Sequence, residues 1–411
     1  MKILLINKFY WQKGGSERVF LHTKKLLEQN GHQVVCFSME DEKNNLPSSY
    51  SKYFVPYTNF QSKNSWFGKA LRFIYYPLAA KNLEKLIQLE KPDIAHLHNI
   101  SHQLTPSILK PLKKHQIPVV QTLHDYQLIC PNYRLFTKGK VCEKCKKHKY
   151  YQCSLNKCVQ NSFWSSSLAG LELFLQWIFR FYKEKVDLFI SPSQFLKDKV
   201  REWGIKQPIN VINNFINIEN FEPNYQNQDY VVCVSRLSKE KGVMTLLKAI
   251  RKLPDIKLKL IGDGQLRKEV EKYIVKKQIK NVEYLGPKYD KELFDLIKNS
   301  KFFIIPSEWY ENYPMLVIEA MALGKPVLAS RLGGLQEMIE ENKTGWFYEP
   351  FSIKDLRSKI KQHYNESDTI EHMGSLARET VEHKNCTKRH YQLLMQAYNQ
   401  VLSKENVVKL G

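Results

Sequence analysis

No apolar run in this chain has the length of a membrane span or the form of a signal peptide. The first apolar residues, Ile3–Ile6, are too few for a signal-peptide core, and no small-residue cleavage site follows them. The longest apolar stretch is Leu168–Tyr182, and polar residues interrupt it at four-residue spacing, namely Glu172, Gln176 and Arg180. We therefore expect a cytoplasmic protein with reduced thiols, peripherally associated with the inner face of the cell membrane.

The sequence also lacks internal repeats, low-complexity tracts, an Asp-x-Asp metal motif and the signature of a nucleic-acid-binding module. What it has in excess is positive charge, because 63 Lys and Arg stand against 41 Asp and Glu, a formal net charge of +22. Such a charge suits nucleic acid, an anionic membrane surface or phosphorylated ligands. Without a nucleic-acid module we expect no nucleic-acid partner, which leaves the other two.

Short apolar segments alternate with helical ones along both halves of the chain. The pattern predicts strands in the first half at 3–6, 33–37, 94–98, 118–123 and 187–190. It predicts strands in the second half at 230–235, 256–261, 282–285, 302–305 and 326–329. The fold class is therefore α/β, with two Rossmann-like, doubly wound parallel sheets facing each other across a cleft. A ligand would bind at the carboxyl ends of their strands.

The 411 residues are enough for two domains. We expect a first domain at 1–215, a linker at 216–228 and a second, ligand-binding domain at 229–385. A last amphipathic helix within 386–411 should cross back to the first domain. Residues 130–160 break the alternation and form a cysteine-rich insertion in the first domain.

A basic loop follows the strand expected at 230–235. Arg236 and Lys241 lie there, between the end of the strand and the start of the next helix. Two cations beside the unpaired backbone amides of a helix amino terminus form an anion site suited to phosphates. The alternative is an ordinary basic loop on a basic protein.

Two glutamates eight residues apart follow the strand expected at 302–305. Glu311 should lie on the loop and Glu319 about one turn into the following helix, on the face of Met315. A carboxylate at Glu319 can accept both ribose hydroxyls of a nucleotide, and one at Glu311 can hold sugar hydroxyls. The alternative is a solvated surface pair, and the nearby Arg/Lys loop favours the functional interpretation.

These segments resemble family 4 of the glycosyltransferases, which has the GT-B fold. The resemblance rests on Arg-Leu-x-x-x-Lys-Gly at 236–242 and Glu-x7-Glu at 311–319, and it covers nearly the whole chain. Further segments occur in the family's order, namely Gly14-Gly15, His124-Asp125, Leu260–Gly264, Pro306-Ser307 and Gly333-Gly334 with Glu337. The resemblance implies a retaining hexosyltransferase that uses a UDP- or GDP-sugar donor without a catalytic metal. Its acceptor would be a glycan or a polyprenyl-linked glycan in bacterial polysaccharide synthesis.

The resemblance also implies roles for individual residues. Arg236 and Lys241 would neutralise the departing diphosphate, while Glu311 and His124 would contact the donor sugar. Glu319 would hold the ribose. Further donor contacts are implied for Gly14, Gly15, Gly262, Gly286, Asn312, Tyr313, Met315 and Leu316. Many relatives have glycine soon after the first glutamate, whereas this chain has Asn312-Tyr313-Pro314, so its donor-sugar pocket differs.

Five of the eight cysteines lie close together, with the spacing C-x11-C-x2-C-x7-C-x4-C. In a cytosolic chain such spacing favours a structural tetrahedral zinc site. We expect the ligands to be Cys142, Cys145, Cys153 and Cys158, with Cys130 as the alternative fourth ligand. An iron–sulfur cluster and reduced free thiols are the other interpretations.

Residues 63–81 mix aromatic side chains with Lys and Arg, a composition typical of a membrane interface. The alternative is a crossover helix whose apolar side is core.

Two other functions stay open, namely a nucleotide-sugar epimerase or phosphorylase of the same fold and a basic, zinc-bearing nucleic-acid-binding protein. A dehydrogenase is disfavoured because Arg267 stands where the dinucleotide motif that begins at Gly262 requires glycine.

Overall fold

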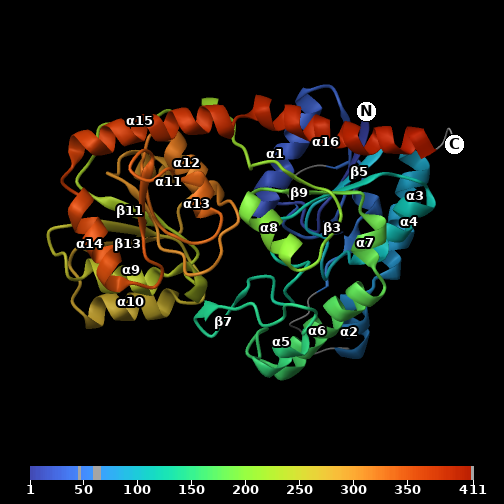
Figure 1. Cartoon of the computed structure of the whole chain (residues 1–411), viewed down its shortest axis with the longest axis horizontal. Coiled ribbons are helices and arrows are strands. Elements are labelled where there is room, and N and C mark those ends of the chain that lie inside the picture. Colours follow the sequence, from blue (N-terminus) through green and yellow to red (C-terminus); the bar gives the residue numbers. More distant parts are fainter. Residues whose placement is uncertain (45–47, 59–65, 409–411) are drawn as a thin grey trace. The chain divides into compact units, whose positions relative to one another are not determined.

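The computed structural model describes residues 1–44, 48–58 and 66–408. Its chain divides into two compact units. The first comprises Met1–Arg134, Glu143–Asn213 and the chain from His390 onward, and the second comprises Leu135–Cys142 and Asn214–Arg389. Each unit is built on a six-stranded parallel sheet (Figure 1), so the expected α/β fold class with two such sheets is confirmed.

The sheet of the first unit has the strand order β10-β9-β6-β5-β1-β2. Its strands are β1 Lys2–Ile6, β2 Gln33–Phe37, β5 Ile94–Leu97, β6 Val119–Thr122, β9 Leu188–Ser191 and β10 Ile209–Val211. The strands are short and almost wholly buried, as expected for a parallel sheet covered by helices on both faces. A separate two-stranded pair joins β3 Met39–Glu40 to β4 Val55–Pro56.

Helices of the first unit cover its sheet and extend beyond it. They are α1 Gly15–Gln29, α2 Trp66–Ile74, α3 Pro77–Glu90, α4 Leu109–Lys114, α5 Tyr151–Leu155, α6 Phe163–Ile178, α7 Phe181–Lys185, α8 Gln194–Glu202 and α16 Thr387–Val408. From α16, Leu394, Ala397 and Tyr398 pack in one core cluster with residues of β1 and β2. The last helix therefore returns to the first unit (Figure 1).

The apolar stretch Leu168–Tyr182 does not lie in one helix. Helix α6 ends at Ile178, and α7 starts at Phe181. Arg180, between them, has a φ of 49° in the left-handed region, which a continuous right-handed helix does not accommodate. The segment 130–160, which interrupts the expected alternation of strands and helices, contains α5 and a short hairpin. The hairpin pairs β7 Phe136–Thr137 with β8 Lys140–Val141.

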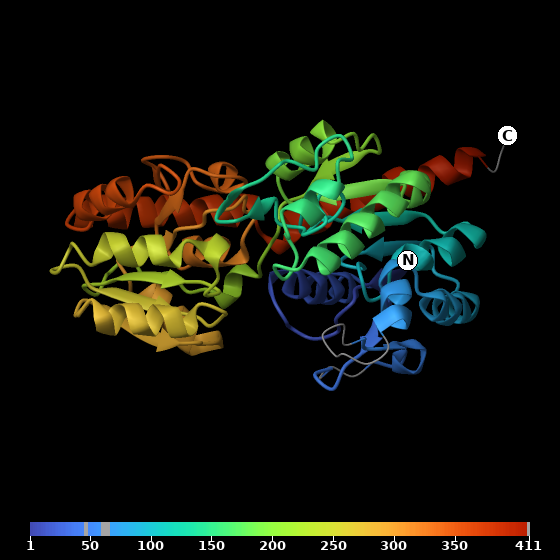
Figure 2. The same cartoon turned by 90° about the horizontal axis from the view of Figure 1, so that it is seen from below.

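The sheet of the second unit has the strand order β13-β12-β11-β14-β15-β16. Its strands are β11 Val231–Val234, β12 Leu258–Ile261, β13 Val282–Gly286, β14 Phe303–Ile305, β15 Val327–Ser330 and β16 Gly345–Tyr348. Its helices are α9 Val243–Ile250, α10 Arg267–Lys276, α11 Asp290–Lys298, α12 Met315–Ala322, α13 Leu335–Met338, α14 Ile353–His363 and α15 Ser367–Lys384. Figure 2 shows its strands lying between layers of helices.

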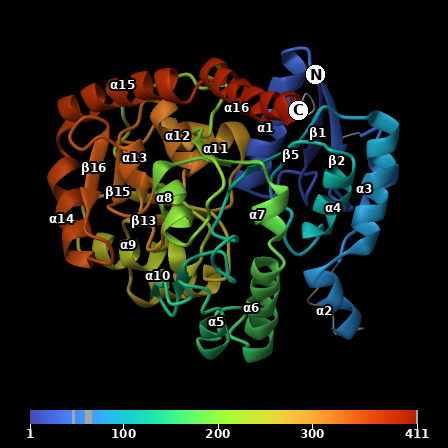
Figure 3. The ribbon, with the colours of Figure 1, turned by 45° about the vertical axis from the view of Figure 1, so that its right-hand side comes forward.

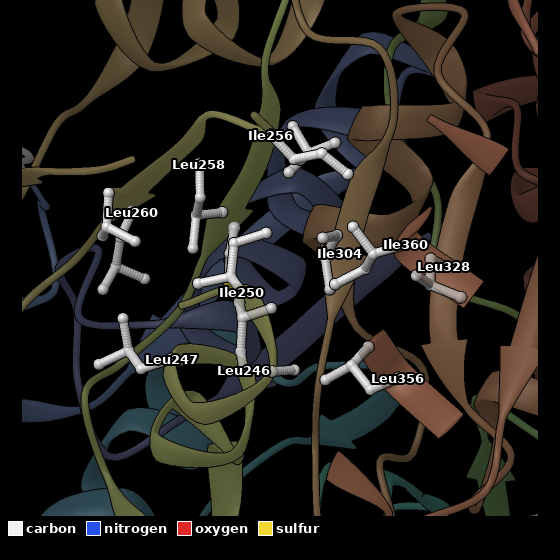
Figure 4. Packing of buried hydrophobic residues seen from close by; sticks show 14 of the residues in the cluster. Leu246, Leu247, Ile250, Ile256, Leu258, Leu260, Ile304, Leu328, Leu356 and Ile360 are labelled. Carbon is white, nitrogen blue, oxygen red and sulfur yellow. The ribbon is translucent and has the colours of Figure 1, made fainter. Parts of the chain in front are cut away.

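The core of the second unit joins the sheet to α9 and α14. Leu246 and Ile250 of α9 and Leu356 and Ile360 of α14 point toward strand residues such as Ile304 (Figure 4). All five side chains are completely buried, so α9 and α14 are held firmly on the sheet. Because these helices are fixed, the loops that precede them at the strand ends are also positioned.

The polar segment 216–228 hydrogen-bonds to the second unit. It contains a 3₁₀ turn at Ile218–Asn220, and the amides of Asn224 and Gln228 donate to the carbonyls of Leu323 and Asn299. The division between the units falls between Asn213 and Asn214.

Candidate active site

Four loops meet at the carboxyl edge of the second unit's sheet. They follow β12, β11, β14 and β15, which are neighbours in the strand order. Because parallel strands present all their carboxyl ends at one edge, residues far apart in the sequence gather there. The loops carry Gly262, Arg236, Glu311 and Gly334, so the structure brings together the segments that the sequence analysis singled out in this half of the chain.

Glycines let these loops approach one another more closely than other residues would. A Cβ on Gly262 would lie 1.9 Å from the carbonyl oxygen of Ser235, and one on Gly334 would lie 1.8 Å from that of Asn312. Gly262 also has a φ of 138°, a backbone conformation that residues other than glycine rarely adopt. The backbone contacts therefore fix the loop after β12 against the loop after β11, and the loop after β15 against the Glu311–Asn312 turn.

Lys241 and Glu311 form an ion pair at the centre of this edge. The Nζ of Lys241 lies 2.5 Å from Oε1 of Glu311, and the hydroxyl of Ser307 donates to the same oxygen at 2.5 Å. The Glu311 side chain is only 5% exposed, whereas that of Lys241 is 19% exposed. The ammonium also lies 5.0 Å from the ring centroid of Trp309. A cation is thus held in a mostly buried setting where its attraction for an anion is strong.

Arg236 lies on the loop that leads to Lys241 and is more open to solvent. Its Nη2 lies 2.7 Å from Oε1 of Glu240, which is itself buried, while 54% of the Arg236 side chain is exposed. The buried Glu240 carboxylate positions the guanidinium and leaves much of its surface accessible to a ligand. Arg236 and Lys241 therefore lie on the same segment between β11 and α9, and their binding of a phosphate stays a prediction.

The loop after β14 leads directly into α12. Pro314 precedes Met315, the first helical residue, and Leu316 follows, so the first backbone amides of α12 are those of the predicted donor-binding residues. Glu319 lies in the second turn of α12 and is completely buried. Its position one turn into the helix agrees with the sequence interpretation, and its role in holding a ribose stays a prediction.

Tyr313 is engaged with the structure on both sides. Nδ2 of Asn385 donates to its hydroxyl at 3.1 Å, and Nδ2 of Asn214 donates to its carbonyl oxygen at 2.8 Å. Burial raises the pKa of Tyr313 to about 12. These contacts give the side chain a structural role, so any contact of Tyr313 with a donor falls to its backbone.

The predicted Gly286, at the end of β13, has a φ of 68° and open space beside its Cα.

In the first unit, His124 lies at the carboxyl ends of two neighbouring strands with a second histidine. His98 follows β5 and His124 follows β6, and their Nδ1 and Nε2 atoms are 2.9 Å apart with the rings stacked. Burial, and to a smaller extent the ammonium of Lys8, lower the pKa of His124 to about 3. His124 is therefore neutral at physiological pH, and His98 positions its ring.

The histidine pair borders a hollow that is entirely within the first unit. Its lining includes His98, Ser101, Thr122, Asp125 and Tyr182. Sequence analysis named His124 and missed His98. The signal was present, because Leu97-His98 and Leu123-His124 both close predicted strands that neighbour each other in a parallel sheet.

The glycine pair of the first unit lies at the start of α1. Gly14 is the extended residue before the helix, and Gly15 is its first residue. A Cβ on Gly15 would meet nothing within 4 Å, and one on Gly14 would meet only the Glu17 carboxylate, at 3.5 Å. The protein's own packing thus does not require glycine at either position, and the role of the pair in binding a ligand stays a prediction.

The clustered cysteines are reduced in this structure. The pKa of the Cys153 thiol is raised by a hydrogen bond with Cys158 and by burial. Cys130 and Cys145 raise the pKa of Cys153 further. Cys142 falls in the second unit. Within residues 1–44, 48–58 and 66–408, no group of three or more His, Cys, Asp or Glu is placed to hold a metal ion.

Two family models match the chain. One, described as Glycosyltransferase Family 4, covers residues 13–220, and the other, described as Glycosyl transferases group 1, covers residues 214–380. The chain belongs to the family 4 glycosyltransferases. The expected resemblance and the expected transferase activity are thereby confirmed.

Relatives and solved structures agree with this family. An uncharacterized glycosyltransferase of Methanocaldococcus jannaschii is 27% identical over 92% of this chain and 93% of its own. N-acetyl-alpha-D-glucosaminyl L-malate synthase of Bacillus anthracis is 24% identical over 93% and 92%. The fold is similar to sucrose-phosphate synthase of Thermosynechococcus elongatus, with a TM-score of 0.72, 19% identity and coverage of 98% and 99%. It is also similar to Anabaena HepE in complex with UDP and glucose, with a TM-score of 0.66, 19% identity and coverage of 97% and 99%.

Proposed function

We propose that this glycosyltransferase moves a hexosyl group from a UDP- or GDP-sugar to a glycan or polyprenyl-linked acceptor, with retention at the anomeric carbon. The observation that carries the proposal is the Lys241–Glu311 pair beside Arg236 at the carboxyl edge of the second sheet. A nucleoside diphosphate placed there meets two cations and the amides that open α12. The complex of the similar HepE with UDP and glucose supports a nucleotide-sugar donor.

In this proposal, catalysis consists of stabilising the leaving group. As the bond between the anomeric carbon and the phosphate oxygen breaks, its electrons pass to the diphosphate, and Lys241 turns from Glu311 toward the growing charge. The acceptor hydroxyl attacks the anomeric carbon from the same face, so the departing phosphate oxygen is close enough to take its proton. Glu311, released from the ammonium, can accept hydroxyls of the sugar.

The other predicted residues have supporting roles in the proposal. Glu319 holds the ribose, and the backbone at Asn312 and Leu316 contacts the phosphates. Gly286 leaves room for the base. In the first unit, neutral His124 contacts the donor sugar, and the Gly14–Gly15 backbone approaches the donor or the acceptor.

A thermal-shift screen with UDP-, GDP- and ADP-sugars tests the donor proposal. We expect one nucleotide class to raise the melting temperature of the wild type and to have little effect on Lys241→Ala. The control is Lys239→Ala, which removes an exposed lysine from the same turn. Equal shifts for the Lys241 and Lys239 variants would contradict the proposed site.

We further propose a structural zinc ion in the cysteine cluster. The proposed ligands are Cys142, Cys145, Cys153 and Cys158, with Cys130 as the alternative to Cys142. Binding requires the thiols to turn toward a common point. Elemental analysis should find about one zinc per chain that Cys153→Ser loses, and whichever of Cys130→Ser and Cys142→Ser also loses it identifies the fourth ligand. Metal-free wild-type protein of unchanged stability would overturn this proposal.

Peripheral association with the inner face of the cell membrane is also part of the proposed function. The segment 63–81 supports it only weakly, because Phe73 stacks on His102 with ring centroids 4.1 Å apart and Arg72 packs 3.8 Å from the ring of Tyr76. Lys63 lies outside the described residues. No helix in the described part of the chain is long and apolar enough to cross a membrane.

A further inference from the structure

Helix α6 exposes its apolar face and buries polar side chains, the opposite of what a surface helix of a water-soluble protein normally does. Its exposed side chains are large and apolar, namely Phe163, Trp164, Leu171, Phe174, Trp177 and Ile178, followed by Phe179. Trp164 is 72% exposed and Phe179 is 60% exposed. The side chains on its buried face include the polar ones of Ser166, Glu172 and Gln176. A helix that faced only water would present the opposite pattern.

Specific contacts fix α6 in this orientation. Glu172 is completely buried, and its Oε2 lies 3.1 Å from Nδ1 of His102. Nε2 of Gln176 donates to Oε1 of Glu172 at 3.0 Å. Gly170 packs so closely on α5 that a Cβ there would lie 3.1 Å from the carbonyl oxygen of Tyr150. Turning the helix to bury its aromatic side chains would break all three contacts, so the apolar face is held toward the outside.

The exposed face is continuous along the helix. Trp164, Leu171 and Ile178 recur every seven residues, and Phe174 lies between them at the spacing of one helical face. Trp177 stacks on His148 with ring centroids 4.2 Å apart, which keeps this large side chain in a fixed position. A contiguous apolar face of this kind marks an interaction site. Figures 1 and 3 show α6 beside α5, on the part of the first unit that also carries α2.

Positive charge surrounds this apolar face in the sequence and on the surface. Residues 143–183 contain seven Lys and Arg and two acids. Of these acids, Glu143 pairs with Lys199, and Glu172 is completely buried with its carboxylate beside His102. The exposed cations of the segment are Lys144, Lys147, Lys149, Lys157, Arg180 and Lys183. The surface therefore combines aromatic and aliphatic side chains with an excess of cations, and the exposed Glu184 that follows the segment pairs with Arg180.

We propose that α6 is the membrane-docking element of this enzyme and lies in the plane of an anionic phospholipid surface. Its 16 residues extend about 24 Å, which is less than a bilayer core of about 30 Å and suits a helix lying on the surface. Trp and Phe enter the headgroup boundary while the cations contact lipid phosphates. A second copy of the chain is a poorer occupant, because both copies would bring the same positive charge to the contact.

The proposal rests on the membrane association in the proposed function and not on the transfer chemistry. Vesicles of phosphatidylcholine alone and of phosphatidylcholine with phosphatidylglycerol are mixed with the full chain and sedimented. We expect the wild type to sediment with the anionic vesicles and to be released by high salt. The variant Trp164→Glu/Leu171→Glu should bind at least about tenfold more weakly.

The matched control is Val275→Glu, which places a charge on a side chain of α10 that is 77% exposed. It should bind vesicles like the wild type. Both variants should keep the wild-type melting temperature and the wild-type rate of donor hydrolysis in detergent-free solution, which separates docking from catalysis. Tryptophan emission should shift to the blue with anionic vesicles in the wild type and shift less in Trp164→Phe.

Two outcomes would overturn the proposal. One is wild-type protein that stays in the supernatant with anionic vesicles. The other is a dimer, detected by analytical ultracentrifugation, that Trp164→Glu/Leu171→Glu dissociates while vesicle binding is unchanged. The second outcome would assign the apolar face to a copy of the chain instead of a membrane.

Discussion

Replacing Lys241 by alanine removes a cation from two partners at once, the buried Glu311 carboxylate and the proposed diphosphate. Without the ammonium of Lys241, the Glu311 carboxylate, whose side chain is only 5% exposed, keeps the hydrogen bond from the hydroxyl of Ser307. Breaking a buried pair from one side typically costs about 3 to 5 kcal/mol, and the partial exposure of Lys241 places this pair near the lower end. We expect the free energy of unfolding of Lys241→Ala to fall by about 3 kcal/mol.

The effect on turnover should be separable from the effect on stability. A cation that acts on the leaving group contributes about 3 kcal/mol to the barrier, or roughly a hundredfold in rate. The double variant Lys241→Ala/Glu311→Gln removes both charges, so it should recover most of the lost stability. It should not recover turnover, because the diphosphate still lacks its cation.

Urea unfolding and donor turnover, measured on the wild type, both single variants and the double variant, complete the cycle. Glu311→Gln alone should keep more turnover than Lys241→Ala, since it leaves the ammonium in place. If the double variant recovers turnover together with stability, Lys241 serves only as the counter-ion of Glu311. That result would refute the assignment of Lys241 to the leaving group.

Two further predictions follow from packing and burial. The free energy of unfolding of Gly334→Ala should fall by at least about 2 kcal/mol, because the new Cβ would overlap the Asn312 carbonyl oxygen. Gly15→Ala should keep its stability, because a Cβ there meets nothing, and should lose affinity for the donor or the acceptor. Thermal unfolding and kinetics on the two variants check this pair of outcomes. Burial lowers the pKa of His96 and His124 to about 3, so the unfolded chain takes up their protons first as the pH falls below about 6.5. Stability should therefore be full above pH 7 and decrease toward pH 4, by up to about 1.4 kcal/mol per pH unit for each histidine, and His96→Gln should flatten that slope.

The second sheet could be predicted well because its strands are short apolar runs between helices with clear ends. The expected strands differ from β11–β15 by no more than two residues at either end. β16 was missed. Gly345–Tyr348 is a four-residue run, buried throughout, and such a run has no period that distinguishes a strand from other buried structure.

Pairings at the site were harder to predict than the residues themselves. The sequence indicated Lys241 for phosphate and Glu311 for sugar, but the two are 70 positions apart, and nothing in their spacing shows that they bind each other. His98 was missed for a similar reason. Its partner His124 becomes visible only when β5 and β6 are placed side by side in the sheet.

The orientation of α6 shows where periodicity stops being informative. Its pattern separates an apolar face from a polar one, but it does not show which face meets the rest of the protein. For most surface helices of soluble proteins the apolar face packs on the core, and nothing in the spacing of 168–182 shows that α6 is an exception. What reverses the default is His102, which lies 70 residues before Glu172 and holds that carboxylate inside the fold. A polar residue at the centre of an otherwise apolar helix therefore predicts orientation only once its partner is known. Contacts that hold the polar side inward leave the apolar side for a partner outside the chain.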